Sequence, residues 1–320
     1  MSYHRHLSGK EQDMQTLLTI TGPTASGKTS LAVSVARAVD GEIISADSRQ
    51  VFRGMDIGTG KDLSEYNEGG FPVAYHLIDI HDPGYEYNVY QFQNDFIQAF
   101  HQIVNTGRQP ILCGGTGLYI DAVVRNFPLA HAPIDPKFRA SVSDIDDAEL
   151  TRRLAALVPL HNHTDTEDRE RLIRALEIQE YALRHPQHHV VMPPMKHAVV
   201  AVTFPRDILI QRIEQRLRQR LEAGMIDEVH RLLDSGVDAQ RLIRYGLEYR
   251  HLTRYLIHEC NYDQMFEELF RDIRRFAKRQ MTYLRHMERN GVTLHWIDGR
   301  MGTAQLTQQI MDKYFSLTTY

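Results

Sequence analysis

The sequence predicts an α/β fold of the phosphate-loop NTPase type: a parallel sheet with helices on both faces, plus a small helical insertion domain. Three observations predict it. Short apolar strands alternate with amphipathic helices in the first part of the chain, an order typical of a mostly parallel sheet. A glycine-bearing loop joins the first strand to the first helix. From about Asn126 the pattern becomes helical, and a strand returns only near Val199.

The first strand is the apolar run Leu17–Thr21, and the amphipathic helix after the loop spans about Thr29–Val39. Further strands are expected at Glu42–Ser45, Tyr75–Ile80 and Pro110–Cys113, with a helix over Tyr90–Thr106. Because strands and helices alternate, their crossovers are expected to cover both faces of the sheet.

The insertion is expected at residues 126–196, between core segments 16–125 and 197–320. It contains a loop with three prolines, Pro128, Pro133 and Pro136, and helices near Asp146–Leu157 and Thr166–Arg184. Beyond it we expect strands at Val199–Phe204 and Thr293–Ile297, a C-terminal helix, and helices at Arg206–Ala223, Met225–Ser235, Tyr245–Ile257 and Tyr262–Arg289.

Composition limits the class of protein. The chain has 320 residues, 42% of them hydrophobic, which is enough for a substantial core. Two cysteines are too few for a disulfide or zinc framework. No apolar run approaches the roughly 20 residues that cross a membrane. Residues 1–15 are polar, so we expect a disordered tail, no secretory signal, and a cytoplasmic protein.

The net charge of −4 does not by itself favour a nucleic-acid partner. Between Ala201 and Asn290, however, 17 Lys and Arg residues outnumber 14 Asp and Glu residues. An anionic partner for the C-terminal half therefore stays open.

The loop after the first strand reads GPTASGKT and fits the phosphate-loop pattern. Its backbone N–H groups and the start of the following helix favour an anion. The Lys28 ammonium would neutralise phosphate oxygens, and the Thr29 hydroxyl would ligate Mg²⁺. The expected phosphate-binding residues are Gly22, Pro23, Thr24, Ala25, Ser26, Gly27, Lys28 and Thr29. The motif specifies a di- or triphosphate but not the reaction.

Other polar loops follow the predicted strands. Asp47 and Ser48 come after the second strand, Thr59 and Lys61 lie in MDIGTGK, and Thr116 lies in CGGTGLY. The carboxyl ends of parallel strands meet at one sheet edge, so these loops should form a site beside the phosphate loop. Asp47 suits a general base or a Mg²⁺ ligand through water, although a turn or cap role is as common. An ATPase would instead need a Walker-B acid, and Asp79 is the candidate.

GPTASGKT, EIISADSRQVFRGMDIGTGK and LCGGTGLY together resemble the tRNA dimethylallyltransferase (tRNA isopentenyltransferase) family. EDRERLIRALEI, RIEQRL, YGLEYRHL and AKRQMTYLR continue the resemblance in the family's order, from about Thr21 to Trp296. The chain departs from the family at HNHTDTEDRER, where many bacterial members have a Pro-Asn-Asp-Pro turn.

The resemblance implies that the phosphate loop holds dimethylallyl diphosphate and that diphosphate is a leaving group. The prenyl group would pass to N6 of the adenosine 3′ of the anticodon in a tRNA. The implied catalytic residues are Asp47 as general base, Thr116, Arg171 and Arg216. The implied tRNA contacts are Asp47, Ser48, Arg49, Gln50, Thr116, Arg139, Glu170, Arg171 and Arg174. We expect a monomer that grips the anticodon stem-loop, with Mg²⁺ as cofactor.

Several alternatives stay open. Arg212, Arg216 and Arg220 share one helix face, which is either a solvated surface or the wall of a channel for the anticodon stem. The aromatic rings of Phe52, Tyr119 and Tyr249 would stack on bases or, more commonly, fill the core. Alternative functions are prenyl transfer to free AMP, ADP or ATP, a small-molecule kinase, and a non-catalytic RNA-binding module.

Overall fold

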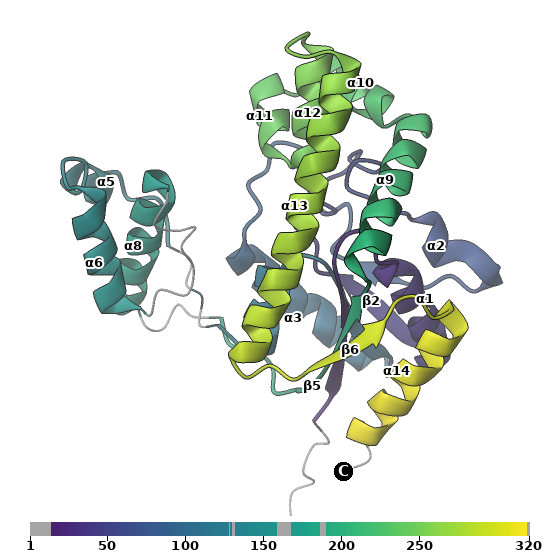
Figure 1. Ribbon diagram of the computed structural model, residues 1–320. Coiled ribbons are helices and arrows are strands. Elements are labelled where there is room, and N and C mark those ends of the chain that lie inside the picture. Colours follow the sequence, from purple (N-terminus) through teal and green to yellow (C-terminus); the bar gives the residue numbers. More distant parts are fainter. Residues whose placement is uncertain (1–13, 128, 130–131, 159–167, 186–189, 319–320) are drawn as a thin grey trace, which may run out of the picture. The chain divides into compact units, whose positions relative to one another are not determined.

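The structure is a computed structural model that describes residues 14–127, 129, 132–158, 168–185 and 190–318 (Figure 1). The chain divides into two compact units: one runs up to Arg125 and resumes at Pro193, and the other is Asn126–Met192. Most of the predicted tail, residues 1–13, lies outside the described residues. Gln15, its last residue, is held by the sheet, because its carbonyl accepts the N–H of Lys196 at 3.0 Å.

The described part of the first unit contains a six-stranded sheet in the order β3-β2-β4-β1-β5-β6. Every pairing is parallel, which confirms the predicted fold class. The strands are β1 (Thr16–Thr21), β2 (Gly41–Ser45), β3 (Tyr75–His76), β4 (Gln109–Gly114), β5 (Lys196–Thr203) and β6 (Leu294–Asp298). All residues of β1 and β4 are buried, as expected for central strands covered on both faces.

Helices cover both faces of this sheet. α1 (Lys28–Val39) connects β1 to β2, which lies nearer the β3 edge of the sheet. α3 (Val89–Asn105) connects β3 to β4, in the opposite direction across the sheet. Because such crossovers are right-handed, opposite directions put the two helices on opposite faces. α14 (Thr303–Thr318) packs beside α1, and α4 (Gly117–Val124) packs beside α3.

A second layer of helices stands beyond the carboxyl ends of the strands (Figure 1). It comprises α9 (Arg206–Glu222), α10 (Met225–Asp234), α11 (Ala239–Arg244), α12 (Leu247–Leu256) and α13 (Tyr262–Arg289). These helices share one apolar core with Val51, Phe52 and Met55 from the segment after β2. The short α2 (Ser64–Asn67) and a 3₁₀ turn (Glu68–Gly70) follow that segment.

The second unit contains α5 (Pro136–Ser141), α6 (Asp147–Leu157) and α8 (Arg169–Arg184). Its core is small and built from Val142, Leu150, Leu154, Leu172 and Leu176. Pro136 was expected in a loop but begins α5, so that expectation is wrong. The Asp135 carboxylate accepts the N–H groups of Lys137 and Phe138, and the fixed φ of proline suits the first helical position.

Two other expectations are wrong at element ends. The strand expected over Tyr75–Ile80 stops at His76, because Leu77 and Asp79 have φ values of 62° and 57°. The N–H of Asp79 instead bonds to the carbonyl of Gln50 at 3.0 Å. The helix expected from Tyr245 begins at Leu247, and α11 precedes it. Within the described residues no helix is both long and apolar enough to span a membrane.

Candidate active site

The phosphate loop joins β1 to α1 and leaves the start of α1 open. Gly27, the residue before the helix, has φ 77°, a left-handed conformation that glycine adopts without penalty. No side chain caps the first turn of the helix, so its N–H groups point at any anion placed there. Ala25 is also left-handed, with φ 62°, and its carbonyl accepts the Arg212 Nε–H at 2.8 Å. Strained non-glycine backbone of this kind is typical of ligand-binding loops.

Gln280 of α13 ties this loop to the one that follows β4. Its Oε1 accepts the N–H of Thr24 at 2.8 Å, and its Nε2 donates to the carbonyl of Gly115 at 2.9 Å. A Cβ on Gly115 would lie 2.5 Å from that amide nitrogen, so only glycine allows the approach. Gln280 was not predicted as a site residue, although it lies inside the AKRQMTYLR match.

Arg216 and Arg220 reach the same loop from α9. Arg216 donates to Thr24 Oγ1 at 3.5 Å and to the Asp62 carboxylate at 2.8 Å, and Arg220 lies 3.5 Å from the same carboxylate. Burial and the nearby Arg216 lower the pKa of the partly exposed Lys28 ammonium. A solvated surface therefore does not describe Arg216 and Arg220, whose side chains are 30% and 13% exposed, whereas Arg212 of the same face is exposed.

Asp47 and Thr116 come together at the carboxyl ends of β2 and β4. The N–H of Ser48 donates to Thr116 Oγ1 at 3.1 Å, and the N–H of Thr116 donates to the Ala46 carbonyl at 3.1 Å. Asp47 Oδ1 accepts the N–H of Arg49 at 2.9 Å. The charge of Asp47 acts to raise the pKa of Lys28, against the larger effect of burial, so the carboxylate lies near the phosphate loop.

Two predicted residues near this edge are committed to internal contacts. The buried Gln50 accepts the Ser45 hydroxyl at 2.8 Å and donates to the Gly60 carbonyl at 3.0 Å. Lys61, only 1% exposed, pairs with Asp56 and with Asp79, the Walker-B candidate. The Asp79 carboxylate is thus engaged by an ammonium group instead of standing free for a metal ion.

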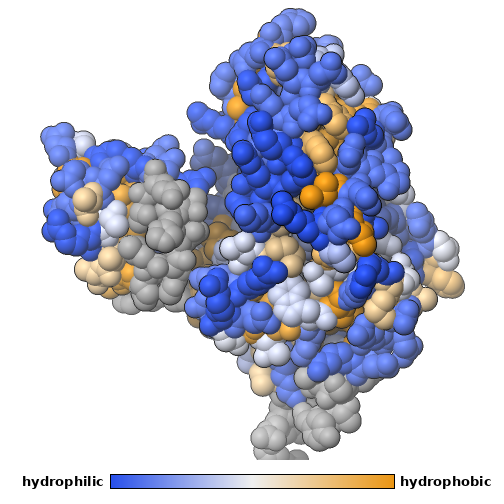
Figure 2. All heavy atoms as spheres, in the orientation of Figure 1, coloured by the Kyte–Doolittle hydropathy of each residue, from blue (hydrophilic) through white to orange (hydrophobic). Residues whose placement is uncertain are grey.

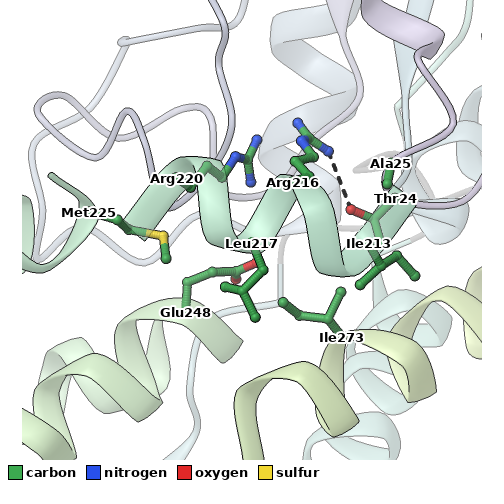
Figure 3. Close-up of a pocket in the computed structure, with 9 residues that line it drawn as sticks. All are labelled: Thr24, Ala25, Ile213, Arg216, Leu217, Arg220, Met225, Glu248 and Ile273. Carbon is green, nitrogen blue, oxygen red and sulfur yellow. Dashed lines mark hydrogen bonds between the residues drawn. The ribbon is translucent and has the colours of Figure 1, made fainter. Parts of the chain in front are cut away.

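A pocket opens beside Thr24 and Ala25, between α9, α12 and α13, and its empty space, open solvent included, is about 280 Å³. Figure 3 shows Arg216 and Arg220 on one side of α9 and the apolar side chains of α9 on the other. The apolar lining is Ile213, Leu217, Met225 and Ile273. Glu248 of α12 is the acidic residue of the lining, and burial raises its pKa, opposed chiefly by Arg220. Figure 2 shows a strip of hydrophobic surface between α13 and α9, flanked by hydrophilic side chains.

The predicted RNA-contacting residues of the second unit differ in how free they are. Arg139 and Arg174 both pair with the buried Glu177, at 3.3 and 2.5 Å. Arg171 and Glu170 are exposed at the start of α8. A role for Arg171 in catalysis stays a prediction. The aromatic rings of Phe52, Tyr119 and Tyr249, at most 4% exposed, belong to the core.

Comparison with known proteins identifies the family. The sequence model described as "IPP transferase" matches residues 50–287, and the one described as "Isopentenyl transferase" matches residues 15–70. The chain belongs to the IPP transferase family. Together the two matches cover the phosphate loop, the arginines of α9 described above, and Gln280.

Curated members of this IPP transferase family match over nearly the full chain. "tRNA dimethylallyltransferase 2" of Phocaeicola vulgatus is 47% identical over 296 residues, which are 92% of this chain and 96% of that protein. "tRNA dimethylallyltransferase 2" of Trichlorobacter lovleyi is 50% identical over 301 residues, 94% of this chain and 97% of that one.

Solved structures agree with this IPP transferase assignment. The tRNA isopentenylpyrophosphate transferase of Bacillus halodurans matches with a TM-score of 0.67 and 33% identity, over 93% of this chain and 96% of that one. A eukaryotic dimethylallyltransferase, described as acting on tRNA, matches with a TM-score of 0.71, over 89% of this chain and 74% of that one. At 19% identity the second match shows the fold alone.

Proposed function

We propose that this chain transfers the dimethylallyl group from dimethylallyl diphosphate to N6 of the adenosine 3′ of the anticodon in tRNA, with release of diphosphate. Membership of the IPP transferase family and the names of relatives 47–50% identical support the reaction class. The observation that carries the proposal is the joining of the Asp47 and Thr116 loops, by the Ser48–Thr116 hydrogen bond, beside a phosphate loop.

Asp47 would act as the general base. The adenine amine attacks the allylic carbon while the carbon–oxygen bond to diphosphate breaks, and the nitrogen gains positive charge. An aspartate carboxylate is a weak base for a neutral amine, but it accepts the proton readily once the nitrogen–carbon bond is forming. Thr116 Oγ1 accepts from the N–H of Ser48, so its own proton is available to a ring nitrogen of the acceptor base.

The leaving diphosphate would gain charge within reach of Lys28, Arg216 and the N–H groups at the start of α1. Preorganised donors of this kind stabilise charge that develops in the transition state. The five-carbon group suits the apolar lining of the pocket beside Thr24 and Ala25. That lining would also exclude water from the allylic cation-like carbon.

Mg²⁺ is proposed as the cofactor, held by the Thr29 hydroxyl and by diphosphate oxygens. Within the described residues no group of three or more His, Cys, Asp or Glu side chains could hold a metal ion. The donor set still fits Mg²⁺, which usually keeps several waters and binds through substrate phosphates and few protein ligands. Bound there, it would neutralise part of the diphosphate charge.

For the acceptor, the exposed side of α13 offers a row of cations over a hydrophilic surface (Figure 2). Its exposed Arg and Lys residues are Arg271, Arg274, Arg275, Lys278, Arg279, Arg285 and Arg289. Phosphate contacts by such residues make binding fall steeply with salt. We propose a tRNA anticodon stem-loop as partner of a cytoplasmic monomer, with the target base unstacked into the site.

The test is a labelled-donor assay with dimethylallyl diphosphate, Mg²⁺ and either unmodified tRNA or AMP. Label should enter tRNA, and Asp47→Asn should lower the rate by about 10²–10⁴-fold, the usual worth of a general base. Asp82→Asn is the matched control, since it removes an 81%-exposed carboxylate that pairs with Arg53. Label in AMP would move the function to the free-nucleotide enzymes, and ATP turnover without any donor would indicate a kinase.

A further inference from the structure

Three arginines of α9 reach the phosphate loop or its surroundings, and one carboxylate, that of Asp62, faces two of them, Arg216 and Arg220. Its Oδ2 lies 2.8 Å from Arg216 Nη2 and 3.5 Å from Arg220 Nη2. Arg216 also donates to Thr24 Oγ1 within the phosphate loop, at 3.5 Å. The same guanidinium group therefore joins the Asp62 carboxylate to the phosphate-binding residues.

The charges around Asp62 make such a carboxylate necessary. Burial, and then the charge of Arg216, lower the pKa of Lys28 and of Arg220, so three cations repel one another in a small region. Asp62 opposes this for Arg220, as its charge raises that pKa. Glu248 opposes it as well, but Asp62 is the carboxylate that lies within 3.5 Å of both guanidinium groups.

The segment that carries Asp62 is fixed at several points. The buried Glu228 carboxylate accepts the N–H groups of Asp56 at 2.9 Å, Ile57 at 2.7 Å and Gly58 at 3.1 Å. It also accepts the hydroxyl of the buried Tyr249 at 2.6 Å. This carboxylate thus holds three successive peptide groups.

Glycine is required where the arginines pass this segment. Gly60 has φ 65°, and a Cβ there would lie 1.7 Å from Arg220 Nη2 and 2.7 Å from Arg216 Nη2. The guanidinium groups therefore lie directly on the backbone, two residues before the carboxylate that pairs with them. Packing against Gly60 and the charge of Asp62 therefore favour the same arrangement of these arginines.

We infer that Asp62 is a positioning residue: it holds Arg216 and Arg220 in the arrangement in which they meet the departing diphosphate. The inference rests on the proposed function. Asp62 is itself an anion and contributes nothing attractive to a diphosphate. Its removal should therefore leave ground-state affinity for diphosphate unchanged or higher, while the chemical step slows because the donors are no longer preorganised.

The experiment compares Asp62→Asn with Arg216→Ala, which removes a direct phosphate contact. Initial rates give kcat and KM for dimethylallyl diphosphate, and calorimetry with inorganic diphosphate and Mg²⁺ gives Kd. For Asp62→Asn we expect kcat to fall by about 10-fold or more, since small misplacements cost up to about 10²-fold, with Kd unchanged or lower. Arg216→Ala should lower kcat and also weaken the binding of diphosphate. Glu214→Gln is the matched control on α9, the helix of Arg216, because it removes a carboxylate that lies 2.8 Å from a different arginine, Arg218.

A kcat within twofold of wild type would overturn the inference. So would a parallel loss of kcat and diphosphate affinity in Asp62→Asn, because that pattern indicates a general structural defect. If Asp62→Asn does not fold, Asp62→Glu decides in the same way, since it keeps the charge and displaces it by one methylene. The proposed function fails if the wild-type protein binds diphosphate but transfers no label. In that case diphosphate binding alone decides the inference about Asp62, which fails if Asp62→Asn binds diphosphate more weakly than wild type.

Discussion

Two glycine–lysine turns in this protein look alike in sequence and differ in their surroundings. Lys28 ends SGK in the phosphate loop, and Lys61 ends TGK in the segment after β2. Within the described residues the Lys28 ammonium donates to the Pro23 carbonyl at 3.4 Å, and burial lowers its pKa. The Lys61 ammonium is buried against two carboxylates and the Phe52 carbonyl.

The difference shows how to separate a binding lysine from a structural one. A desolvated cation with few partners and cationic neighbours is held ready for an anion that arrives from outside. A cation whose donors are all engaged by the protein stabilises the fold and has none left for a ligand.

The largest expected effect is on Lys28. Lys28→Ala should reduce kcat/KM for prenyl transfer by about 10²–10³-fold, the cost of one preorganised donor to a developing charge. The free energy of unfolding should stay close to that of wild type, because the Lys28 ammonium makes few stabilising contacts within the protein. Transfer rates and a denaturant titration check both halves. Equal activity in the variant would contradict the comparison.

Lys61→Met should have the opposite profile. It leaves the Asp56 and Asp79 carboxylates without their shared cation, and breaking a buried pair typically costs about 3–5 kcal/mol. We expect about 3 kcal/mol here, since the carboxylates are 56% and 32% exposed and solvent screens them. Urea unfolding measures the loss. The folded fraction should still bind inorganic diphosphate with the wild-type Kd, and a weakened Kd would show that Lys61 serves the ligand.

Glu228→Gln tests the structural role of the segment that carries Lys61, because Glu228 holds the backbone of that segment. The amide offers one acceptor oxygen where the carboxylate offers two, so at least one of the bonds to Asp56, Ile57 and Gly58 is lost. A buried donor left unsatisfied costs about 1–3 kcal/mol. Thermal unfolding should report that loss, and Glu222→Gln, at an exposed position at the end of α9, is the control. A Tm equal to wild type would contradict the role of Glu228.

The smallest effect concerns Glu65, which lies close to Asp62. Burial, and then the charge of Asp62, raise its pKa from 4.5 to about 7, and its Oε2 is buried without a hydrogen-bond partner. The folded state therefore holds this proton more tightly than the unfolded state. Its stabilising contribution is present below pH 4.5 and is lost as pH rises through 7.

Glu65→Gln should remove this pH dependence. The variant should gain about 2 °C in Tm over wild type at pH 8 and nothing at pH 4.5. Scanning calorimetry at the two pH values measures the difference. A gain of the same size at both values would mean that the change acts through packing and not through ionisation.

Much of the fold could be predicted from the chain alone. Apolar runs such as Leu17–Thr21 and the loop GPTASGKT are local patterns, because burial and an anion-binding turn each need only a few neighbouring residues. The end of β3 could not be predicted. YHLIDI has the composition of a strand, but Leu77 and Asp79 take left-handed backbone because their neighbours are the segment after β2.

For the candidate site, the sequence by itself predicted the phosphate loop, Asp47 and Thr116, since each follows a strand whose carboxyl end should face a ligand. Only the tertiary structure decided which similar side chains serve that edge and which serve the fold. Gln280 and Asp62 come to the loop, while Lys61 and Gln50 turn into the protein. The reason is that hydrogen-bond and charge partners lie far apart in the chain, 256 residues in the case of Thr24 and Gln280, and no local pattern records them.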